Sequence, residues 1–493
     1  MSNTTRRDAL IGLGLGTAGL LWPRRRVHAA PGFNLSDLED LARRFRETPQ
    51  NEVFDVAAEA IRAGADYKAL LGAVFFAGIH EVRPRQVGGK LHSVMMVESA
   101  HQLAENASAE EAWLAAFWNL NDFKRSQRID RLQGDWVLPP TPDVSFPNEE
   151  AARAEFVSAM QDWDDDRADR AIVGLCKHHS RESLFELIWP LASRCYVNIG
   201  HKIIYAVQIE RVLRRIDWKL AEAPLRSLVN AMLFTRADGP RTSSFDHGLN
   251  LAAKFPDNWL DGKRDSLESR VILKQLRDAE SEQAQQLVVT ALEQGLAPES
   301  IWDGMRLYAS EIFVKRPPSA PRSRSTILPV HPVTVTNAFG YVWRNTTNES
   351  TRRLAILQAA GWLPLLKRDL TRIIRLSTEG PGIDQLGAEE EPAKAIDTVF
   401  DARSPAQTRA FLDKSPDQIA AYFGRLRGGM FRRAVEHHQY KYAAAVWEES
   451  RLVDPRWRAR LLAPAIDYLP TAAEPETQVY EQTMHALRKA GVS

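Results

Sequence analysis

Apolar residues recur every three or four positions along most of this chain, as they do on one face of an α-helix. Period-two alternation, which is typical of strands, is almost absent, and its nearest case, 333–336, follows Pro332 and fits a helix that starts at the proline. The helical pattern is clear in segments 35–47, 53–64, 110–127, 152–163, 202–216, 223–234, 270–295, 351–370, 416–436 and 441–452. The sequence therefore predicts an all-α protein.

Two Pro-rich polar segments, 134–150 and 314–329, predict exposed connectors between helical regions. We therefore expect helical regions at 30–135, 150–315 and 327–493. Helices of this length, joined by short loops, favour an irregular stack of antiparallel hairpins of the α-solenoid or α-α type. The chain shows no repeat of fixed period, so such a stack has two or three unequal subregions.

The first 29 residues have the layout of a secretory signal. Arg6-Arg7 precede an apolar run of about 13 residues. After Arg24–Arg26 come the small residues that are typical of a signal-peptide cleavage site. The Arg pair favours the twin-arginine (Tat) export machinery as a partner, although Asp8-Ala9-Leu10 departs from the Phe-Leu of that pattern. The run is shorter than the roughly 20 residues of a membrane span. We expect a periplasmic or otherwise extracytoplasmic, soluble protein with no stable membrane span after cleavage.

The net charge narrows the classes of molecule that the protein could bind, and the two cysteines leave two alternatives open. The chain has a net charge of +1, and without residues 1–29, which hold five Arg and one Asp, it has about −3. This balance argues against nucleic acid or anionic lipid and leaves a small molecule or a protein as the partner. Cys176 and Cys195 fit either a disulfide in an oxidising compartment or two buried thiols.

The segment GGKLHSVMMVESAH, residues 88–101, places two histidines and a glutamate in an apolar helical run. His101 shares a helix face with Glu98, three residues away. His92 lies roughly 180° around a straight helix from His101, so it can join that site only from a first turn or loop. These residues are either metal ligands or polar groups that are hydrogen-bonded inside a core.

Four further residues combine metal-binding chemistry with a suggestive position. Glu182 and Glu186 follow His178 at four-residue steps, unless Ser180 starts a new helix there. His201 follows Gly200 at a helix start, and a buried Glu311 would need a cation or a strong hydrogen bond.

His331 precedes a helix that begins at Pro332. Thr334 and Asn337 lie within the first turns of that helix, which makes a small polar patch. This patch fits either helix capping or a binding site.

Segments VGGKLHSVMMVESAHQLA, NIGHKIIYAVQIERVL and HPVTVTNAFGYVWRNTTNES resemble a family of exported, Tat-signal, all-helical bacterial proteins to which no activity is assigned. The resemblance covers roughly residues 85–365. It implies Asn at the position of Glu98, which shifts the ligand hypothesis toward His92, His101, His201 and His331. A fainter similarity, at the level of the fold, is to questin oxidase-like proteins.

The chain lacks GxSxG, HExxH, P-loop and CxxCH motifs, which excludes several common chemistries. Our first hypothesis is a metal-dependent oxidoreductase that holds iron, copper or zinc, because imidazole suits these metals. Its ligands would come from His92, His101, His201, His331, Glu182, Glu186 and Glu311. The alternative is a non-catalytic periplasmic scaffold or binding protein whose histidines are satisfied internally. Convergence of the histidines on one point distinguishes the two.

Overall fold

The computed structural model describes residues 35–492 except 236–242, 320–322 and 378. The described residues form helices and contain no β-strand, only an isolated bridge between Lys263 and Leu296. This confirms the all-α prediction. By their contacts, residues 33–493 group into one compact unit. The three helical regions expected at 30–135, 150–315 and 327–493 remain a prediction. The predicted export signal lies outside the described residues.

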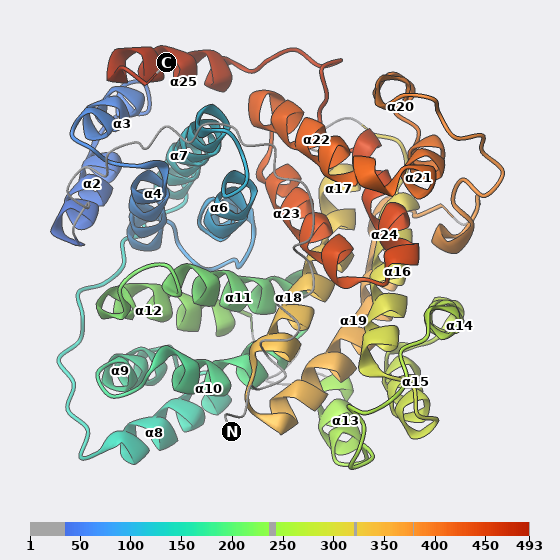
Figure 1. The fold of residues 1–493 in the computed structure, drawn as a ribbon. Helices are drawn as coiled ribbons and strands as arrows, with labels where there is room; N and C mark the ends of the chain where they lie inside the picture. Colours follow the sequence, from blue (N-terminus) through green and yellow to red (C-terminus); the bar gives the residue numbers. More distant parts are fainter. Residues whose placement is uncertain (1–34, 236–242, 320–322, 378, 493) are drawn as a thin grey trace, which may run out of the picture. The chain divides into compact units, whose positions relative to one another are not determined.

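The helices follow one another along the chain as shown in Figure 1. The first group is α2 (Leu35–Glu47), α3 (Val53–Arg62), α4 (Tyr67–Glu81), α5 (His92–Met95), α6 (Val97–Ala104) and α7 (Ala109–Leu132). The middle group is α8 (Glu149–Asp162), α9 (Asp165–Cys176), α10 (Arg181–Ser193), α11 (His201–Leu213), α12 (Glu222–Met232), α13 (Ser243–Ala252), α14 (Ser266–Asp278), α15 (Ser281–Glu293) and α16 (Pro298–Val314). The last group is α17 (Arg324–Ile327), α18 (His331–Asn345), α19 (Glu349–Ile374), α20 (Ile396–Ala402), α21 (Pro405–Lys414), α22 (Ile419–Arg433), α23 (His437–Leu452), α24 (Pro455–Leu462) and α25 (Gln478–Ala490).

Side-chain caps explain where several long helices begin. Ser108 and Glu111 form a reciprocal capping box at the start of α7, so two backbone N–H groups that the helix leaves unpaired are satisfied. Asn348 caps α19, and Asp66 caps α4, by accepting a hydrogen bond from a backbone N–H three residues on. In the part of the chain that is described, none of these helices is both long and apolar enough to cross a membrane.

Segments far apart in sequence pack together. α25 lies against α3 and α7, so the end of the chain covers helices from its beginning (Figure 1). Arg62 donates a hydrogen bond to the carbonyl oxygen of Lys489 over 3.0 Å, and Lys489 forms an ion pair with Asp55 at 2.7 Å. Cys176 and Cys195 are both free thiols.

Four helices surround the region that carries the candidate chemistry. α6 packs against α11 and α23, and α18 packs against the same two helices, so the four close a ring of contacts. Asn337 on α18 donates hydrogen bonds to Glu448 and Glu449 on α23, at 3.0 and 2.7 Å. Arg211 on α11 donates to Glu448 over 2.8 Å. These buried polar contacts fix the positions of α11, α18 and α23 along one another.

Candidate metal centre

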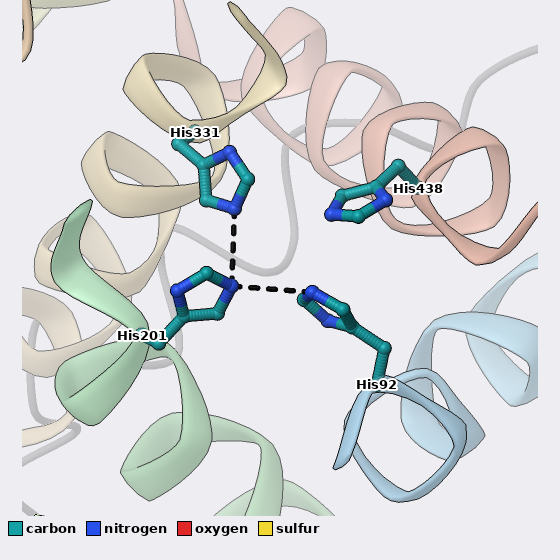
Figure 2. Close-up of side chains that lie close together, drawn as sticks. All are labelled: His92, His201, His331 and His438. Carbon is teal, nitrogen blue, oxygen red and sulfur yellow. Dashed lines mark hydrogen bonds between the residues drawn. The ribbon is translucent and has the colours of Figure 1, made fainter. Parts of the chain in front are cut away.

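Four histidines from distant parts of the chain meet at one end of this ring (Figure 2). They are His92, His201, His331 and His438, which we call the four-histidine cluster. One ligand nitrogen from each lies within 4.8 Å of the other three. Nε2 of His201 is 3.2 Å from Nε2 of His92 and 3.1 Å from Nε2 of His331. None of the four side chains is more than 6% exposed.

Every member of the cluster stands at the start of a helix. His92, His201 and His331 are the first residues of α5, α11 and α18, and each follows a 3₁₀ turn: η1 (Gly89–Leu91), η2 (Asn198–Gly200) and η4 (Leu328–Val330). His438 is the second residue of α23. The N-terminus of a helix carries partial positive charge, which disfavours a protonated imidazole. The position therefore favours the neutral, ligating form.

Two glycines allow the backbone to pack closely around His201. Gly88 has φ +116°, and a Cβ there would lie 3.1 Å from Cε1 of His201. Gly200 has φ +86°, and a Cβ there would collide with Cγ2 of Val335. Both positions need glycine, because an L side chain rarely adopts such a φ and would meet a neighbour.

His201 and His331 use the same local contact to aim their rings. Nδ1 of His201 donates to the carbonyl oxygen of Asn198 over 2.6 Å, and Nδ1 of His331 donates to that of Leu328 over 2.9 Å. A carbonyl oxygen only accepts, so the proton of each neutral ring is on Nδ1. Both Nε2 atoms are then bare lone pairs that face each other across 3.1 Å. Such a pair repels unless a cation lies between the nitrogens.

His438 is oriented by a carboxylate. Its Nδ1 donates to Oε2 of Glu436 over 2.7 Å, and its Nε2 is buried without a hydrogen-bond partner in the described structure. Burial raises the pKa of Glu436, but the charge of His438 and its hydrogen bond outweigh burial and lower that pKa to about 2. A carboxylate that holds the outer nitrogen of a histidine is the usual second partner of a metal-bound imidazole.

His92 meets a buried lysine instead. Nζ of Lys441 lies 3.0 Å from Nδ1 of His92, and burial lowers the pKa of Lys441 to about 7. With this pKa, Lys441 is present near neutral pH both as the charged ammonium and as the neutral amine. In the amine form it can accept the Nδ1 proton of His92, which leaves Nε2 of His92 bare and facing His201.

Burial also keeps the cluster uncharged. It lowers the pKa of His92, His201 and His331 well below the ordinary histidine value, and the nearby Lys441 charge lowers each of them further. Burial lowers the pKa of His438 to about 4, against the opposite effect of Glu436. The four imidazoles are therefore neutral near pH 7, which is the form that binds metals.

The spacing fits a transition-metal ion. A tetrahedral ion with nitrogen ligands at about 2.0–2.1 Å places neighbouring nitrogens about 3.3–3.4 Å apart. The two Nε2 separations measured around His201, 3.1 and 3.2 Å, are close to that edge. An all-imidazole set suits zinc, copper, iron or nickel better than magnesium or calcium. The four histidines could thus hold such an ion.

Three of the four histidines expected to converge therefore do so, and His101 does not. His101 stacks on Tyr67 with ring centroids 5.8 Å apart and lies 3.4 Å from Glu105. The buried Glu98 forms an ion pair with the exposed Arg215 at 2.8 Å. α5 ends at Met95 and α6 begins at Val97, so His92 and His101 belong to different helices and face different neighbours.

The three predicted carboxylates also lie outside the cluster, because other segments supply their partners. Glu182 is exposed and pairs with Arg181, and Ser180 caps α10 as the alternative interpretation held. Glu186 accepts hydrogen bonds from Oγ1 of Thr346 and the backbone N–H of Thr347. The buried Glu311 forms an ion pair with Arg277 at 2.6 Å.

Sequence reasoning missed His438 and its neighbours Glu436, His437 and Lys441. The pattern placed one helix at 416–436 and the next at 441–452, so the two histidines fell between elements. In the structure α23 begins at His437. A histidine at a helix start, which is the cue that selected His201, would have found His438.

The cluster forms the floor of a cavity of about 620 Å³, which we call the histidine cavity. Arg83, Gln86 and Gln133 line this cavity and are exposed, so it opens to solvent. Its volume lies in the range of small-molecule sites.

Comparison of the chain with protein-family models, with curated proteins and with solved structures finds no match.

Proposed function

We propose that the four-histidine cluster binds one transition-metal ion and that the protein is an exported, metal-dependent oxidoreductase. The observation that carries the proposal is the 3.1 Å approach of the Nε2 atoms of His201 and His331, both bare because their protons are held by carbonyl oxygens. The Nδ1 atoms of these two rings have carbonyl oxygens as hydrogen-bond acceptors, whereas their Nε2 atoms face each other without a proton between them. A metal ion would satisfy them.

Copper and iron fit the proposed activity best, because they change oxidation state in an imidazole site whereas zinc does not. Bound there, such an ion would exchange electrons with a substrate. The residues of the chain would bind the ion through His92, His201, His331 and His438 and orient His438 through Glu436. The histidine cavity would admit the substrate to the ion from one side.

Export by the twin-arginine route is consistent with this proposal. The route carries folded proteins, and the four ligands come from four segments that come together only in the folded chain. The ion would thus be bound before export.

Elemental analysis of the protein, purified without a polyhistidine tag or chelator, tests the metal site. We expect about one equivalent of copper, iron or zinc, which His201→Ala and His438→Ala both abolish. His101→Ala is the matched control, because that histidine is also buried but lies outside the cluster. Circular dichroism checks that each variant is folded.

The possible outcomes separate the parts of the proposal. Bound copper or iron that is reversibly reduced, followed by electron paramagnetic resonance, supports oxidoreductase activity. Bound zinc would contradict the oxidoreductase part of the proposal and support the metal site. A folded protein that takes up none of these metals contradicts the proposal and favours the non-catalytic binding protein.

A further inference from the structure

We propose that the histidine cavity binds a small organic anion, carrying a carboxylate or a phosphate, between Arg83 and Arg125. The inference rests on the proposed function only for what the anion's other end meets, namely the ion at the floor of the cavity. The recognition itself depends on residues outside the four-histidine cluster.

The lining of the cavity is rich in positive charge. It includes four cationic side chains, those of Arg83, Arg85, Lys90 and Arg125, and one carboxylate, that of Asp122. Asp122 lies 3.2 Å from Nδ1 of His437 and is buried. A cavity with this balance attracts negative charge.

Two of the cations already have partners. Arg85 forms an ion pair with Asp165 and donates a hydrogen bond to Asn230 over 3.2 Å. Lys90 forms an ion pair with Asp130 at 2.5 Å. These two side chains are fixed by the protein and contribute mainly to the shape of the wall.

Arg83 and Arg125 are different. Neither guanidinium forms an ion pair or a hydrogen bond with another residue in the described part of the chain, although the side chain of Arg125 is half-buried. Burying part of an unpaired charge is costly, and a guanidinium is shaped to bind two oxygens of a carboxylate or phosphate. A ligand with such a group would supply the missing partner.

The helices around the site also favour a negatively charged ligand. α11, α18 and α23 all begin at the four-histidine cluster, so their partial positive ends converge there. A metal ion held by the four-histidine cluster would add positive charge there. An anionic ligand would offset this excess, which makes negative charge part of a balanced site.

Part of the remaining wall is apolar. Ile129, Ile327 and Leu328 line the cavity beside the arginines. An organic body packs against these side chains, whereas a bare inorganic ion leaves them in contact with water. The ligand class is thus an organic acid or an organic phosphate that fits about 620 Å³.

Fluorine NMR titrations with 4-fluorobenzoate, 4-fluorophenyl phosphate and neutral 4-fluorobenzamide test the inference on the full-length, metal-loaded protein. We expect at least one of the two anions to bind and the amide to bind much more weakly. Arg125→Gln and Arg83→Gln should each weaken the anion about tenfold or more, since each removes a charged hydrogen-bond donor. Arg128→Gln is the control, because Arg128 lies on the same helix, α7, but is exposed and outside the cavity.

Preference for benzoate or for phenyl phosphate identifies the group that the arginines hold, and either supports the inference. Arg125→Lys, which keeps the charge, should restore part of the affinity if Arg125→Gln folds poorly. Equal binding of the amide, or loss of binding in Arg128→Gln as large as in Arg125→Gln, overturns the inference.

Repeating the titration on metal-free protein separates this inference from the proposed function. Anion binding that depends on Arg83 and Arg125 in a protein that never takes up metal leaves this inference standing and removes the proposed function. A protein that binds metal but shows no preference for the anions supports the proposed metal site and overturns this inference.

Discussion

The Nε2 atoms of His201 and His331 lie 3.1 Å apart, although both rings already donate their Nδ1 protons to carbonyl oxygens three residues earlier. Each carbonyl belongs to the 3₁₀ turn before the helix that the histidine opens, so the backbone itself holds both rings in place. The cluster is therefore organised before any ion binds. An ion that enters it replaces a repulsion between lone pairs with two bonds.

Metal binding should stabilise the fold. An ion that binds only the native state adds about 4 kcal/mol when its free concentration is about 1,000 times Kd. We expect copper or zinc to raise the thermal midpoint of the metal-free protein by several degrees in calorimetry. Mg²⁺, which prefers oxygen ligands, should not. A rise of equal size in His201→Ala would show that the ion binds elsewhere.

Glu436→Gln should weaken the metal site without emptying it. The amide oxygen still accepts the Nδ1 proton of His438, but the negative charge that raises the basicity of the ring is lost. We expect metal affinity to fall roughly 10- to 100-fold in competition with a chelator. Glu105→Gln, which changes the carboxylate next to His101, should leave it unchanged.

Gly88→Ala should damage the site through the backbone. The methyl group would press on the ring of His201, and the residue would keep a φ of +116°. Gly134→Ala is the matched control, because Gly134 has φ +127° with nothing within 4 Å of the added Cβ. Both variants should lose about 1–3 kcal/mol of stability in urea denaturation. Only Gly88→Ala should also lose metal affinity.

The metal-free protein should lose stability as the solution becomes acidic. Burial lowers the pKa of His438 from the ordinary 6.5 to about 4, so the unfolded chain takes up this proton at a higher pH than the folded one. The contribution of His438 to the free energy of unfolding is fully present above pH 6.5. It is lost progressively as the pH falls from 6.5 to about 4. Urea denaturation across this range measures the slope, and His438→Gln should make it shallower. An unchanged slope would mean that His438 titrates normally.

The sequence was sufficient for the helical class and for part of the site. His92, His201 and His331 could be selected because a glycine or proline marks the turn beside each of them. Helical spacing tells which residues share a face, but it does not tell what that face meets. His101 was paired with Glu98 for this reason, whereas Arg215, which lies 117 residues from Glu98, is the partner of that carboxylate.

The predicted carboxylates illustrate the same limit. A glutamate in an apolar helix needs a partner, and the sequence could not say whether a metal ion or another residue supplies it. For Glu311 it is Arg277, and for Glu186 it is the Thr346–Thr347 turn. Such contacts depend on how distant helices pack, which local patterns do not encode.

The position of α25 has a consequence for how the chain is made. The ribosome synthesises α3 and α7 before α25, so the surfaces that α25 covers stay exposed until α25 has been made. The hydrogen bond from Arg62 to the carbonyl oxygen of Lys489 spans 427 residues, so it forms only after both residues have left the ribosome. A nascent chain therefore presents an incomplete surface on α3 and α7 to chaperones until α25 emerges, and loss of α25 would leave that surface permanently open.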